Sequence, residues 1–468
     1  MSLDHGAPET RGAGALDLGR PRRIHVIGVG GAGMSAIATV LARMGHDVSG
    51  SDLRDGPVLA RLRASGVRAS AGHDPANVAG AEVVAISTAV AETNPELRAA
   101  RQAQIAVHTR AETLAALAAE RRCIAVAGTH GKTTTSSMLA LVLVEAGLSP
   151  SFLIGGELPQ VGTNAVWGEG EWLVVEADES DGTFLSLRPE IAIVTNVEPD
   201  HLDHYGSVAS LEEAFGSFLL SAGSAAVVCA DDPVAARLAP PDAVRYGFAE
   251  EADVRLANLR GGRSDVSFVL EQGGTTLTEV ELPVPGVHNA LNATAAVVAA
   301  SVIGVSLADA RRALARFGGV ARRFEFRGER NGVVFVDDYA HLPGEVLATL
   351  AAARRGGFGR VVCVFQPHRY SRTAALAGSF ADAFRDADVL VVTGVYAAGE
   401  EPLPGVSGAL IADGVRRAHP GTDVTYVPAR GDVAAHLRSV LRPGDCCISL
   451  GAGDLTGLPD ELLAGPAW

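Results

Sequence analysis

The chain has 468 residues, of which 47% are hydrophobic and 20% charged, and its formal net charge is −15. This length exceeds what one hydrophobic core accommodates and predicts about three domains, and the composition excludes an intrinsically disordered chain. The negative net charge excludes a general nucleic-acid binder, because affinity for nucleic acid needs clustered Lys and Arg. Any phosphate group must therefore be bound locally.

The cysteines and the apolar stretches predict a cytoplasmic protein without membrane insertion. The five cysteines are dispersed and odd in number, as is typical of buried thiols in a reducing compartment. No basic segment followed by an apolar one opens the chain, and the longest apolar stretch, 293–308, is mostly alanine interrupted by Thr, Ser and Gly. Residues 1–20 are polar and Gly-rich, so we expect them to be disordered.

The first block of the chain reads as a parallel sheet. Helical stretches alternate with strand-like runs at 23–28, 47–52, 83–88 and 105–109, and a helix over 111–122 closes the block. This alternation is typical of βαβ units. We therefore expect a Rossmann-like domain over residues 21–122.

A glycine-rich turn follows the first strand. Residues 28–33 read GVGGAG, which fits G-x-G-x-x-G between a strand and a helix, and Asp52 ends the next strand at the distance expected of a ribose contact. Glycines here let the backbone approach a pyrophosphate at the helix N-terminus. The alternative is a turn that serves only tight helix–strand packing. The motif does not decide which dinucleotide-like ligand binds, and alone it is compatible with a nicotinamide-dependent dehydrogenase.

The second block predicts a nucleotide-binding domain over residues 123–323. Its strand-like runs lie at 123–129, 172–178, 191–196 and 226–230. Residues 254–285 alternate polar and apolar, which predicts a small antiparallel sheet, and helices follow from about 288 to 304 and 307 to 317. We expect a P-loop ATPase-type α/β domain.

The phosphate loop of this domain is 128-GTHGKTTT-135, and Lys132 within it is the only lysine of the chain. Gly131, Lys132 and Thr133 supply the end of a phosphate loop: backbone N–H groups, an ammonium, and a hydroxyl for Mg²⁺. The first glycine of the usual pattern is replaced by Val126. A simple helix-capping turn is the alternative, but it leaves the position of the sole lysine unexplained.

Polar residues follow other strands of the second block. Glu176 and Asp178 end one strand and His201 follows another, so they can converge on the phosphate loop and bind a divalent metal. Each is ambiguous alone, since acids at strand ends often cap helices. Residues 288–292, with His288, Asn289 and Asn292, begin a helix where they can meet an adenine, with helix capping as the alternative.

The third block predicts a second Rossmann-like domain over residues 324–468. Its strand-like runs lie at 333–338, 360–365, 388–395, 423–427 and 445–451. Arg323, His368, Arg369 and Arg372 lie in polar segments of this region and suit anionic groups such as a phosphate or an amino-acid carboxylate. Singly, each arginine is more often part of a surface ion pair.

Taken in order, seven segments resemble the Mur ligase family over residues 22 to 455: 28-GVGGAGMS-35, 127-AGTHGKTTT-135, 176-EADESDGTFL-185, 196-NVEPDHLDHY-205, 322-RRFE-325, 366-QPHRYSRT-373 and 396-YAAGEEP-402. The resemblance implies that the first domain binds a UDP-sugar rather than NAD, that the second binds ATP, and that the third completes the nucleotide and amino-acid sites.

The segments are most similar to the family members that add L-alanine to UDP-N-acetylmuramic acid in peptidoglycan synthesis. The implied reaction is ADP-forming: the lactyl carboxylate takes the γ-phosphate of ATP, and the alanine amine attacks the resulting acyl phosphate. The nearest alternative is a murein-peptide ligase, which attaches a preformed peptide to the same UDP-sugar. A nucleotide-binding regulator without ligase chemistry is a further alternative.

The resemblance also implies a role for individual residues. The implied UDP-sugar contacts are Gly28, Gly30, Gly31, Gly33, Met34, Ser51 and Asp52. The implied ATP contacts are Gly128, Thr129, His130, Gly131, Lys132, Thr133, Thr134, His288, Asn289, Asn292, Arg323 and Asp338. The implied ligands of two Mg²⁺ ions, for which Mn²⁺ can substitute, are Thr133, Glu176 and His201. The implied alanine contacts are Tyr339, His368, Arg369 and Arg372. The implied catalytic residues are Lys132, Glu176, His201, His368 and Arg372.

Two positions depart from relatives in the family. Several sibling ligases position a metal with a carbamylated lysine, and this is impossible here because Lys132 is the only lysine; the alanine-adding members lack the device too. The segment 337-DDYAHLP-343 has Leu342 where the family has a second histidine, so position 342 is left out of the expected site. We expect a monomer or weak homodimer.

Overall fold

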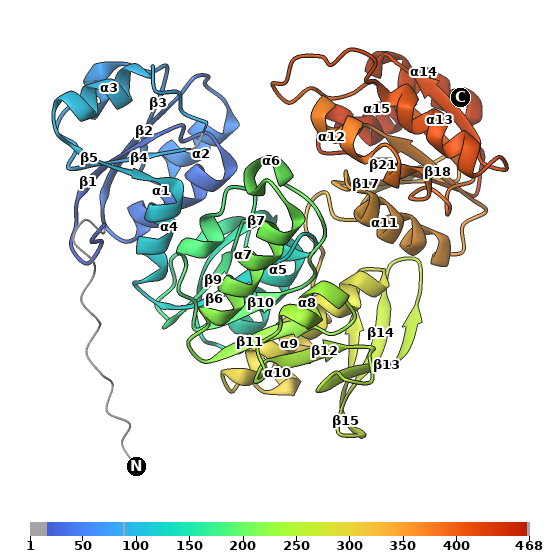
Figure 1. The fold of residues 1–468 in the computed structure, drawn as a ribbon, viewed down its shortest axis with the longest axis horizontal. Coiled ribbons are helices and arrows are strands. Elements are labelled where there is room, and N and C mark those ends of the chain that lie inside the picture. The colour runs from blue at the N-terminus through green and yellow to red at the C-terminus, as the bar shows by residue number, and fades with distance from the viewer. Residues whose placement is uncertain (1–15, 88, 466–468) are drawn as a thin grey trace.

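The computed structural model describes residues 16–87 and 89–465 and arranges them around three sheets (Figure 1). Of the segment expected to be disordered, residues 1–15 lie outside the described residues, whereas Leu16 and Leu18 are buried in the N-terminal core. Within the described residues no helix is both long and apolar enough to cross a membrane. All five cysteines are free and buried.

The N-terminal sheet is parallel throughout, with strand order β3-β2-β1-β4-β5. The order reverses on either side of β1, so the loops after β1 and β4 part at this point and leave room for a ligand. Its elements are β1 (Arg23–Ile27), α1 (Ala32–Arg43), β2 (Asp47–Asp52), α2 (Pro57–Ala64), β3 (Arg68–Ala71), the 3-10 helix η1 (Pro75–Val78), β4 (Val83–Ile86), α3 (Pro95–Gln102), β5 (Ala106–Thr109) and α4 (Arg110–Ala118).

The central sheet has ten strands in the order β15-β14-β13-β12-β11-β10-β6-β9-β7-β8. The strands from β13 to β7 are parallel, and the pairings β13–β14, β14–β15 and β7–β8 at the two edges are antiparallel. Its elements are β6 (Arg122–Ala127), α5 (Lys132–Glu145), β7 (Ser151–Leu158), β8 (Thr163–Val166), β9 (Trp172–Glu176), η2 (Thr183–Ser186), β10 (Ile191–Val194), α6 (Leu202–Tyr205), α7 (Val208–Leu220), β11 (Ala225–Cys229), α8 (Pro233–Leu238), β12 (Val244–Gly247), β13 (Val254–Gly261), β14 (Val266–Gln272), β15 (Thr275–Leu282), α9 (Val287–Val302) and α10 (Leu307–Leu314).

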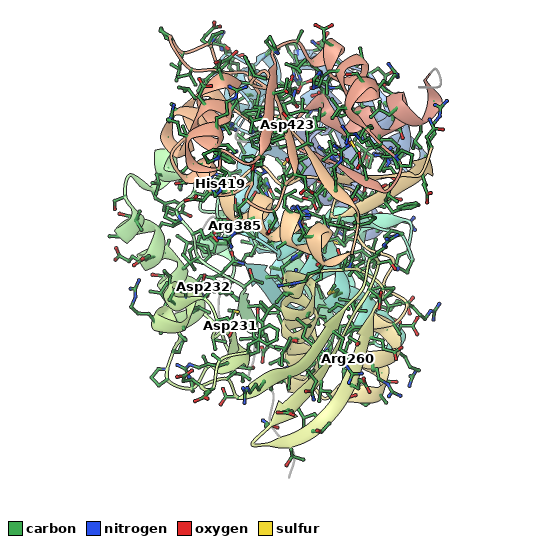
Figure 2. All side chains as sticks on the ribbon, turned by 90° about the vertical axis from the view of Figure 1, so that its right-hand side faces the viewer. Asp231, Asp232, Arg260, Arg385, His419 and Asp423 are labelled. Atoms are coloured by element: carbon green, nitrogen blue, oxygen red, sulfur yellow. The ribbon has the colours of Figure 1, made fainter. Side chains whose placement is uncertain are left out.

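The predicted antiparallel strands β13 to β15 are present, and they continue the central sheet because β12 pairs with β13. In Figure 1 they lie at the end of this domain away from the N-terminal domain. Two adjacent aspartates fix the turn after β11: Asp231 accepts the N–H groups of Phe248 and Ala249, and Asp232 caps α8 (Figure 2). This acidic pair is therefore structural.

The C-terminal sheet has the order β16-β17-β21-β18-β19-β20, and only its edge strand β16 is antiparallel. Its elements are β16 (Glu325–Arg330), β17 (Val333–Asp338), α11 (Pro343–Arg355), β18 (Arg360–Phe365), α12 (Tyr370–Leu376), η3 (Ser379–Ala381), β19 (Val389–Thr393), α13 (Gly408–Ala418), β20 (Asp423–Val427), η4 (Arg430–Asp432), α14 (Val433–Val440), β21 (Asp445–Leu450), η5 (Asp454–Gly457) and α15 (Leu458–Ala464).

The predicted fold class is confirmed: three α/β sheet domains follow one another along the chain (Figure 1). The predicted strands are present within a few residues, although the strand expected over 83–88 ends at Ile86 and residue 88 lies outside the described residues. Strands β3, β7, β8, β12 and β16 were not predicted. Strands β3, β8 and β16 lie at sheet edges, where burial imposes little apolar pattern, and β7 and β12 contain glycines that shorten their apolar runs.

Candidate active site

The phosphate loop joins the buried strand β6 to the buried helix α5. Gly128 has φ 131° and Gly131, the residue before the helix, has φ 82°, a region that only glycine enters readily. A Cβ on Gly128 would lie 2.1 Å from Thr195 Oγ1. The N–H of His130 donates to Asn196 Oδ1 over 2.8 Å. Backbone freedom and this clamp together shape a loop that can accept phosphate at the start of α5.

Lys132 is held inside this loop. Its Nζ donates to the carbonyl oxygens of Gly128 (2.6 Å) and Thr129 (3.1 Å) and to Glu179 Oε1 (2.8 Å). Burial acts to lower the pKa of Lys132, but the nearby carboxylates, Glu179 foremost, raise it. The ammonium is thus charged, preorganised and close to where phosphate would lie.

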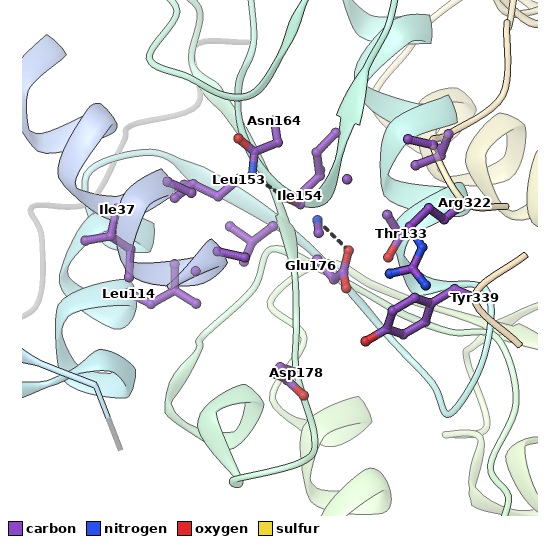
Figure 3. Close-up of a pocket in the computed structure, with 18 of the residues that line it drawn as sticks. Ile37, Leu114, Thr133, Leu153, Ile154, Asn164, Glu176, Asp178, Arg322 and Tyr339 are labelled. Carbon is purple, nitrogen blue, oxygen red and sulfur yellow. Dashed lines mark hydrogen bonds between the residues drawn. The ribbon is translucent and has the colours of Figure 1, made fainter. Parts of the chain in front are cut away.

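A cavity of about 520 Å³ lies where the three domains meet (Figure 3). The N-terminal domain contributes Gly33 and Arg110. The central domain contributes Thr133, Glu176 and Asp178, and the C-terminal side contributes Arg322, Arg323 and Tyr339. In Figure 3 the apolar Ile37 and Leu114 line one end, while Thr133, Glu176 and Tyr339 gather at the other. Expected contacts for the UDP-sugar, metal, ATP and amino acid therefore line one space.

The expected metal ligands are partly brought together. Thr133 and Glu176 line the large cavity, and Glu176 Oε2 accepts the Gly155 N–H over 2.7 Å. His201 lies instead against Asp200, with 3.2 Å between Nε2 and Oδ2. Burial lowers the pKa of His201, although the Asp200 carboxylate acts to raise it. The lowered pKa keeps the imidazole neutral at pH 7. Hydroxyl, carboxylate and neutral imidazole are donors that fit Mg²⁺ or Mn²⁺.

No group of three or more His, Cys, Asp or Glu side chains between residues 16 and 465, residue 88 apart, is arranged to hold a metal ion. Magnesium in phosphoryl-transfer sites commonly uses one or two carboxylates and completes its shell with substrate phosphates and water. The metal assignment therefore stays a prediction that the available oxygen donors fit.

A second cavity of about 230 Å³ collects most of the residues expected to contact ATP. They are His130, Gly131, Thr133, Thr134, His288, Asn289, Asn292, Arg323 and Asp338. Burial and Arg323 lower the pKa of His288 to about 4, so its ring is neutral. Burial raises the pKa of Asp338 to about 6, against the opposing effect of Arg323. A neutral ring and a carboxylate in the lining of one cavity can serve an adenine and a ribose.

Two carboxylates that the sequence analysis did not single out also line this second cavity. Glu198 Oε2 lies 3.2 Å from His130 Nε2, and Glu345 Oε1 lies 3.3 Å from His130 Nδ1. Burial acts to lower the pKa of His130, but the two carboxylates raise it to about 9. A charged phosphate-loop histidine thus links the central domain to α11 of the C-terminal domain.

The glycine-rich turn after β1 joins a buried strand to α1, and three of its expected ligand contacts also have partners within the protein. Asp52 accepts the N–H of Gly30 over 2.8 Å, so it braces the turn itself. Met34 is buried in the apolar core. The Ser51 hydroxyl is fully buried and donates to Glu96. The side chains of Met34 and Ser51 are therefore engaged within the protein, and their assignment to the UDP-sugar stays a prediction.

The expected amino-acid residues cluster at the edge between the central and C-terminal domains. His368 lies between Arg372, whose Nη1 is 3.3 Å from His368 Nδ1, and Tyr396, whose ring stacks on it at 5.7 Å. Arg372 also reaches Asp200 of the central domain over 3.3 Å. Arg369 is exposed, and Tyr339 lies beneath the guanidinium groups of Arg322 and Arg323.

Arg110 and Glu179 are further site residues that the sequence analysis missed. Arg110 Nη2 lies 3.3 Å from Asp178 Oδ2 and Arg110 Nη1 lies 3.6 Å from Asp181 Oδ2. The run 176-EADESD-181 was a signal for both, because a strand end with four acids needs counter-ions. The chain has 39 Lys and Arg residues, so the sequence alone could not show which of them pair with these acids.

The fold and the site define a phosphate-loop protein whose cavity is shared by three α/β domains. Three family models match the chain: "Mur ligase family, catalytic domain" over residues 23–122, "Mur ligase middle domain" over 126–300, and "Mur ligase, glutamate ligase domain" over 322–453. The chain belongs to the Mur ligase family, and the dehydrogenase alternative is therefore excluded.

Curated relatives narrow the comparison. A UDP-N-acetylmuramate--L-alanine ligase from Bradyrhizobium is 47% identical over 94% of this chain and 98% of its own length. One from Rubrobacter xylanophilus is 48% identical over 94% and 99%. The solved UDP-N-acetylmuramate-alanine ligase of Thermotoga maritima has a TM-score of 0.79 at 31% identity, over 95% and 98% of the chains. A murein peptide ligase from Psychrobacter arcticus has a TM-score of 0.67 at 25% identity, over 95% and 98%.

Proposed function

We propose that this chain is an ADP-forming ligase that joins L-alanine to the lactyl carboxylate of UDP-N-acetylmuramic acid in peptidoglycan synthesis. The observation that carries the proposal is the cavity of about 520 Å³ in which Gly33 and Arg110, Thr133 and Glu176, and Tyr339 meet from three domains. A UDP-sugar on the glycine-rich turn would direct its acid toward the phosphate loop there.

Phosphoryl transfer is the first stage. The lactyl carboxylate attacks the γ-phosphorus of ATP, ADP leaves, and an acyl phosphate forms. Lys132 and the N-terminus of α5 stabilise the charge on the transferring phosphoryl group. Magnesium, held by Thr133 and Glu176 with His201 nearby, would neutralise phosphate charge.

Amide formation is the second stage. The alanine amine attacks the acyl phosphate, and the tetrahedral intermediate collapses to the amide and inorganic phosphate. Arg369 and Arg372 suit the alanine carboxylate. His288, Asn289, Asn292 and Asp338 would retain the nucleotide. Closure of the domains would keep water from the acyl phosphate, which otherwise hydrolyses.

The division into domains over 21–122, 123–323 and 324–468 belongs to the same proposal and is supported by the three separate sheets. The proposal also includes a pair of Mg²⁺ ions that Mn²⁺ can replace, and a monomeric or weakly dimeric state. It further includes a cytoplasmic location, which the five free thiols support.

A panel assay of ADP release tests the function. Purified protein with ATP, Mg²⁺ and UDP-N-acetylmuramic acid should release ADP when L-alanine is added, with little stimulation by the tripeptide L-Ala-γ-D-Glu-meso-diaminopimelate. A preference for the tripeptide would instead support the murein-peptide ligase alternative, which the Psychrobacter arcticus structure raises. Glycine and L-serine complete the panel, because a methyl group is worth only about 1–3 kcal/mol.

Substitution of Lys132→Ala tests the phosphate loop. We expect phosphate release to fall by about 100-fold or more, because the ammonium is lost from the transferring phosphate. Binding of the UDP-sugar, measured by calorimetry, should change little since that site lies on another domain. Loss of both together would contradict the proposed division of ligands between domains.

A further inference from the structure

The second stage of the proposed reaction needs a proton acceptor. Free alanine at neutral pH carries an ammonium group, which has no lone pair to attack an acyl phosphate. Three imidazoles lie near the expected amino-acid end: His201, His341 and His368. The structure fixes which ring nitrogen of each is engaged, and so which can take a proton.

His201 and His368 are poorly arranged for this task. His201 is an expected metal ligand, so its lone pair is committed to the metal, and its Nε2 lies 3.2 Å from Asp200 Oδ2. His368 Nδ1 lies 3.3 Å from Arg372 Nη1. A guanidinium only donates, so Nδ1 of His368 uses its lone pair and Nε2 carries the proton. His368 is thus a hydrogen-bond donor toward the site.

His341 has the opposite tautomer. Its Nδ1 lies 3.1 Å from the carbonyl oxygen of Tyr339, which can only accept, so Nδ1 carries the proton and Nε2 keeps a lone pair. Among the residues that the structure describes, none hydrogen-bonds this Nε2. The ring meets His368 edge-on, with 5.7 Å between centroids. His341 therefore has a free lone pair on Nε2, and its ring lies beside His368, one of the expected alanine contacts.

Glu345 fixes this orientation. Its Oε2 accepts the N–H groups of His341 (2.9 Å) and Leu342 (3.2 Å) and lies 3.3 Å from His341 Nδ1. Its Oε1 faces His130 of the phosphate loop. A carboxylate behind the Nδ1 of an imidazole holds the tautomer and stabilises the protonated ring as it forms. The same carboxylate ties this ring to the nucleotide end.

The charges around His341 keep it neutral before reaction. Burial lowers its pKa, and of the groups that face it Arg372 lowers the pKa further while Glu345 and Asp200 raise it. The net shift is downward, so the ring is unprotonated at pH 7. His368, whose own pKa is lowered to about 4 chiefly by burial, adds no charge to this environment.

We propose that His341 is the general base of the second stage, with Nε2 removing a proton from the ammonium of bound alanine. This inference rests on the proposed function. The freed amine forms the C–N bond, and the bond from carbon to the phosphate oxygen breaks. The nitrogen loses its second proton to the departing phosphate, and His341 returns its proton to solvent. Glu345 is a positioning residue that acts through His341.

A change of nucleophile separates this role from a structural one. His341→Gln should lower kcat for alanine by about 100-fold or more, the range of general-base catalysis. Hydroxylamine is unprotonated at neutral pH and needs no base, so UDP-N-acetylmuramate-dependent ADP release with hydroxylamine should stay within about threefold of wild type. Raising the pH should restore alanine turnover in the variant, because alanine then loses its proton to solvent.

His419→Gln is the matched control. His419 also pairs with a carboxylate, with 2.8 Å between Nε2 and Asp382 Oδ1, but on the outer surface of the same domain. It should leave both nucleophiles unaffected. Glu345→Gln should show the same selective loss as His341→Gln, to a smaller extent.

Equal loss with alanine and hydroxylamine would place His341 in the first stage or in folding and overturn the inference. An unchanged kcat for alanine would overturn it too. Failure of the wild-type chain to respond to alanine at all would reject the proposed function instead, so the two failures are distinguishable.

Discussion

At the scale of single residues, two buried acids serve different domains of the molecule. Glu179 pairs with Lys132 of the phosphate loop. Glu96 is fully buried in the N-terminal domain, where it accepts hydrogen bonds from Ser51, Asn77 and the N–H of Asp74 and faces His25 and His73. The first acid belongs to the site, and the second stabilises the domain that carries the glycine-rich turn.

Glu96→Gln should destabilise the N-terminal domain. Burial acts to raise the pKa of Glu96, but hydrogen bonds from His25, Ser51 and Asn77 outweigh it and lower the pKa to about 2. Its contribution is therefore complete above the ordinary value near 4.5 and is lost as pH falls toward 2. The substitution should cost about 2 kcal/mol at pH 7 in urea unfolding and little at pH 2.

Glu92→Gln provides the control for that measurement. Glu92 pairs with Arg101 on the same side of the sheet, but its side chain is 73% exposed. An exposed pair contributes at most about 1 kcal/mol. A similar loss for both variants would show that carboxylate charge alone, and not the buried hydrogen-bond network, stabilises the domain.

At the scale of elements, α5 shows what a strand–loop–helix unit requires. The loop before the helix contains Gly128, and Gly147 follows the C-cap residue Ala146; both glycines have positive φ. A Cβ at Gly128 would overlap Thr195 Oγ1, whereas a Cβ at Gly147 would meet nothing within 4 Å. An alanine at Gly147 would therefore cause backbone strain alone, whereas an alanine at Gly128 would add a steric overlap.

Gly147→Ala should cost about 1 kcal/mol of stability, the cost of a left-handed conformation for alanine, with an unchanged KM for ATP. Gly128→Ala adds the overlap with Thr195 and should reduce ATP-dependent turnover by about 100-fold or more. Steady-state kinetics and thermal unfolding of both variants check this. Equal kinetics in the two variants would mean that the loop tolerates a side chain.

The elements also show what sequence reasoning can reach. Most buried parallel strands were predictable, because strands covered on both faces give continuous apolar runs, but the interior strands β7 and β12 were missed. Edge strands such as β3 and β16 were not predictable. Lys132 was predictable as the sole lysine after a buried strand. Glu345 and His341 were missed because their roles depend on a contact between α11 and the phosphate loop, across about 200 residues of sequence.

At the scale of the whole molecule, the site depends on how three domains dock. Arg110 is the tie on the N-terminal side, since its guanidinium reaches Asp178 and Asp181 of the central domain. Arg372 to Asp200 and His130 to Glu345 are ties on the C-terminal side. Each tie uses residues that line or adjoin the expected substrate sites, so substrate binding and docking of the domains are linked.

Arg110→Ala should raise KM for the UDP-sugar by about tenfold, equivalent to about 1.4 kcal/mol, because it weakens docking beside Gly33. KM for ATP should change by less than about threefold. Arg98→Ala removes an exposed arginine of the same domain and should change neither value. Small-angle scattering should show a larger radius of gyration for the Arg110 variant with both substrates present. An unchanged KM for the UDP-sugar would remove Arg110 from the docking role.

The single lysine has a practical consequence. Reductive methylation with ¹³C-formaldehyde would label one side-chain amine in the chain, and that amine is the one paired with Glu179. Its NMR resonance would report from inside the phosphate loop without any substitution. The order in which nucleotide and sugar reach the loop could then be followed in the native sequence as successive shifts of one peak.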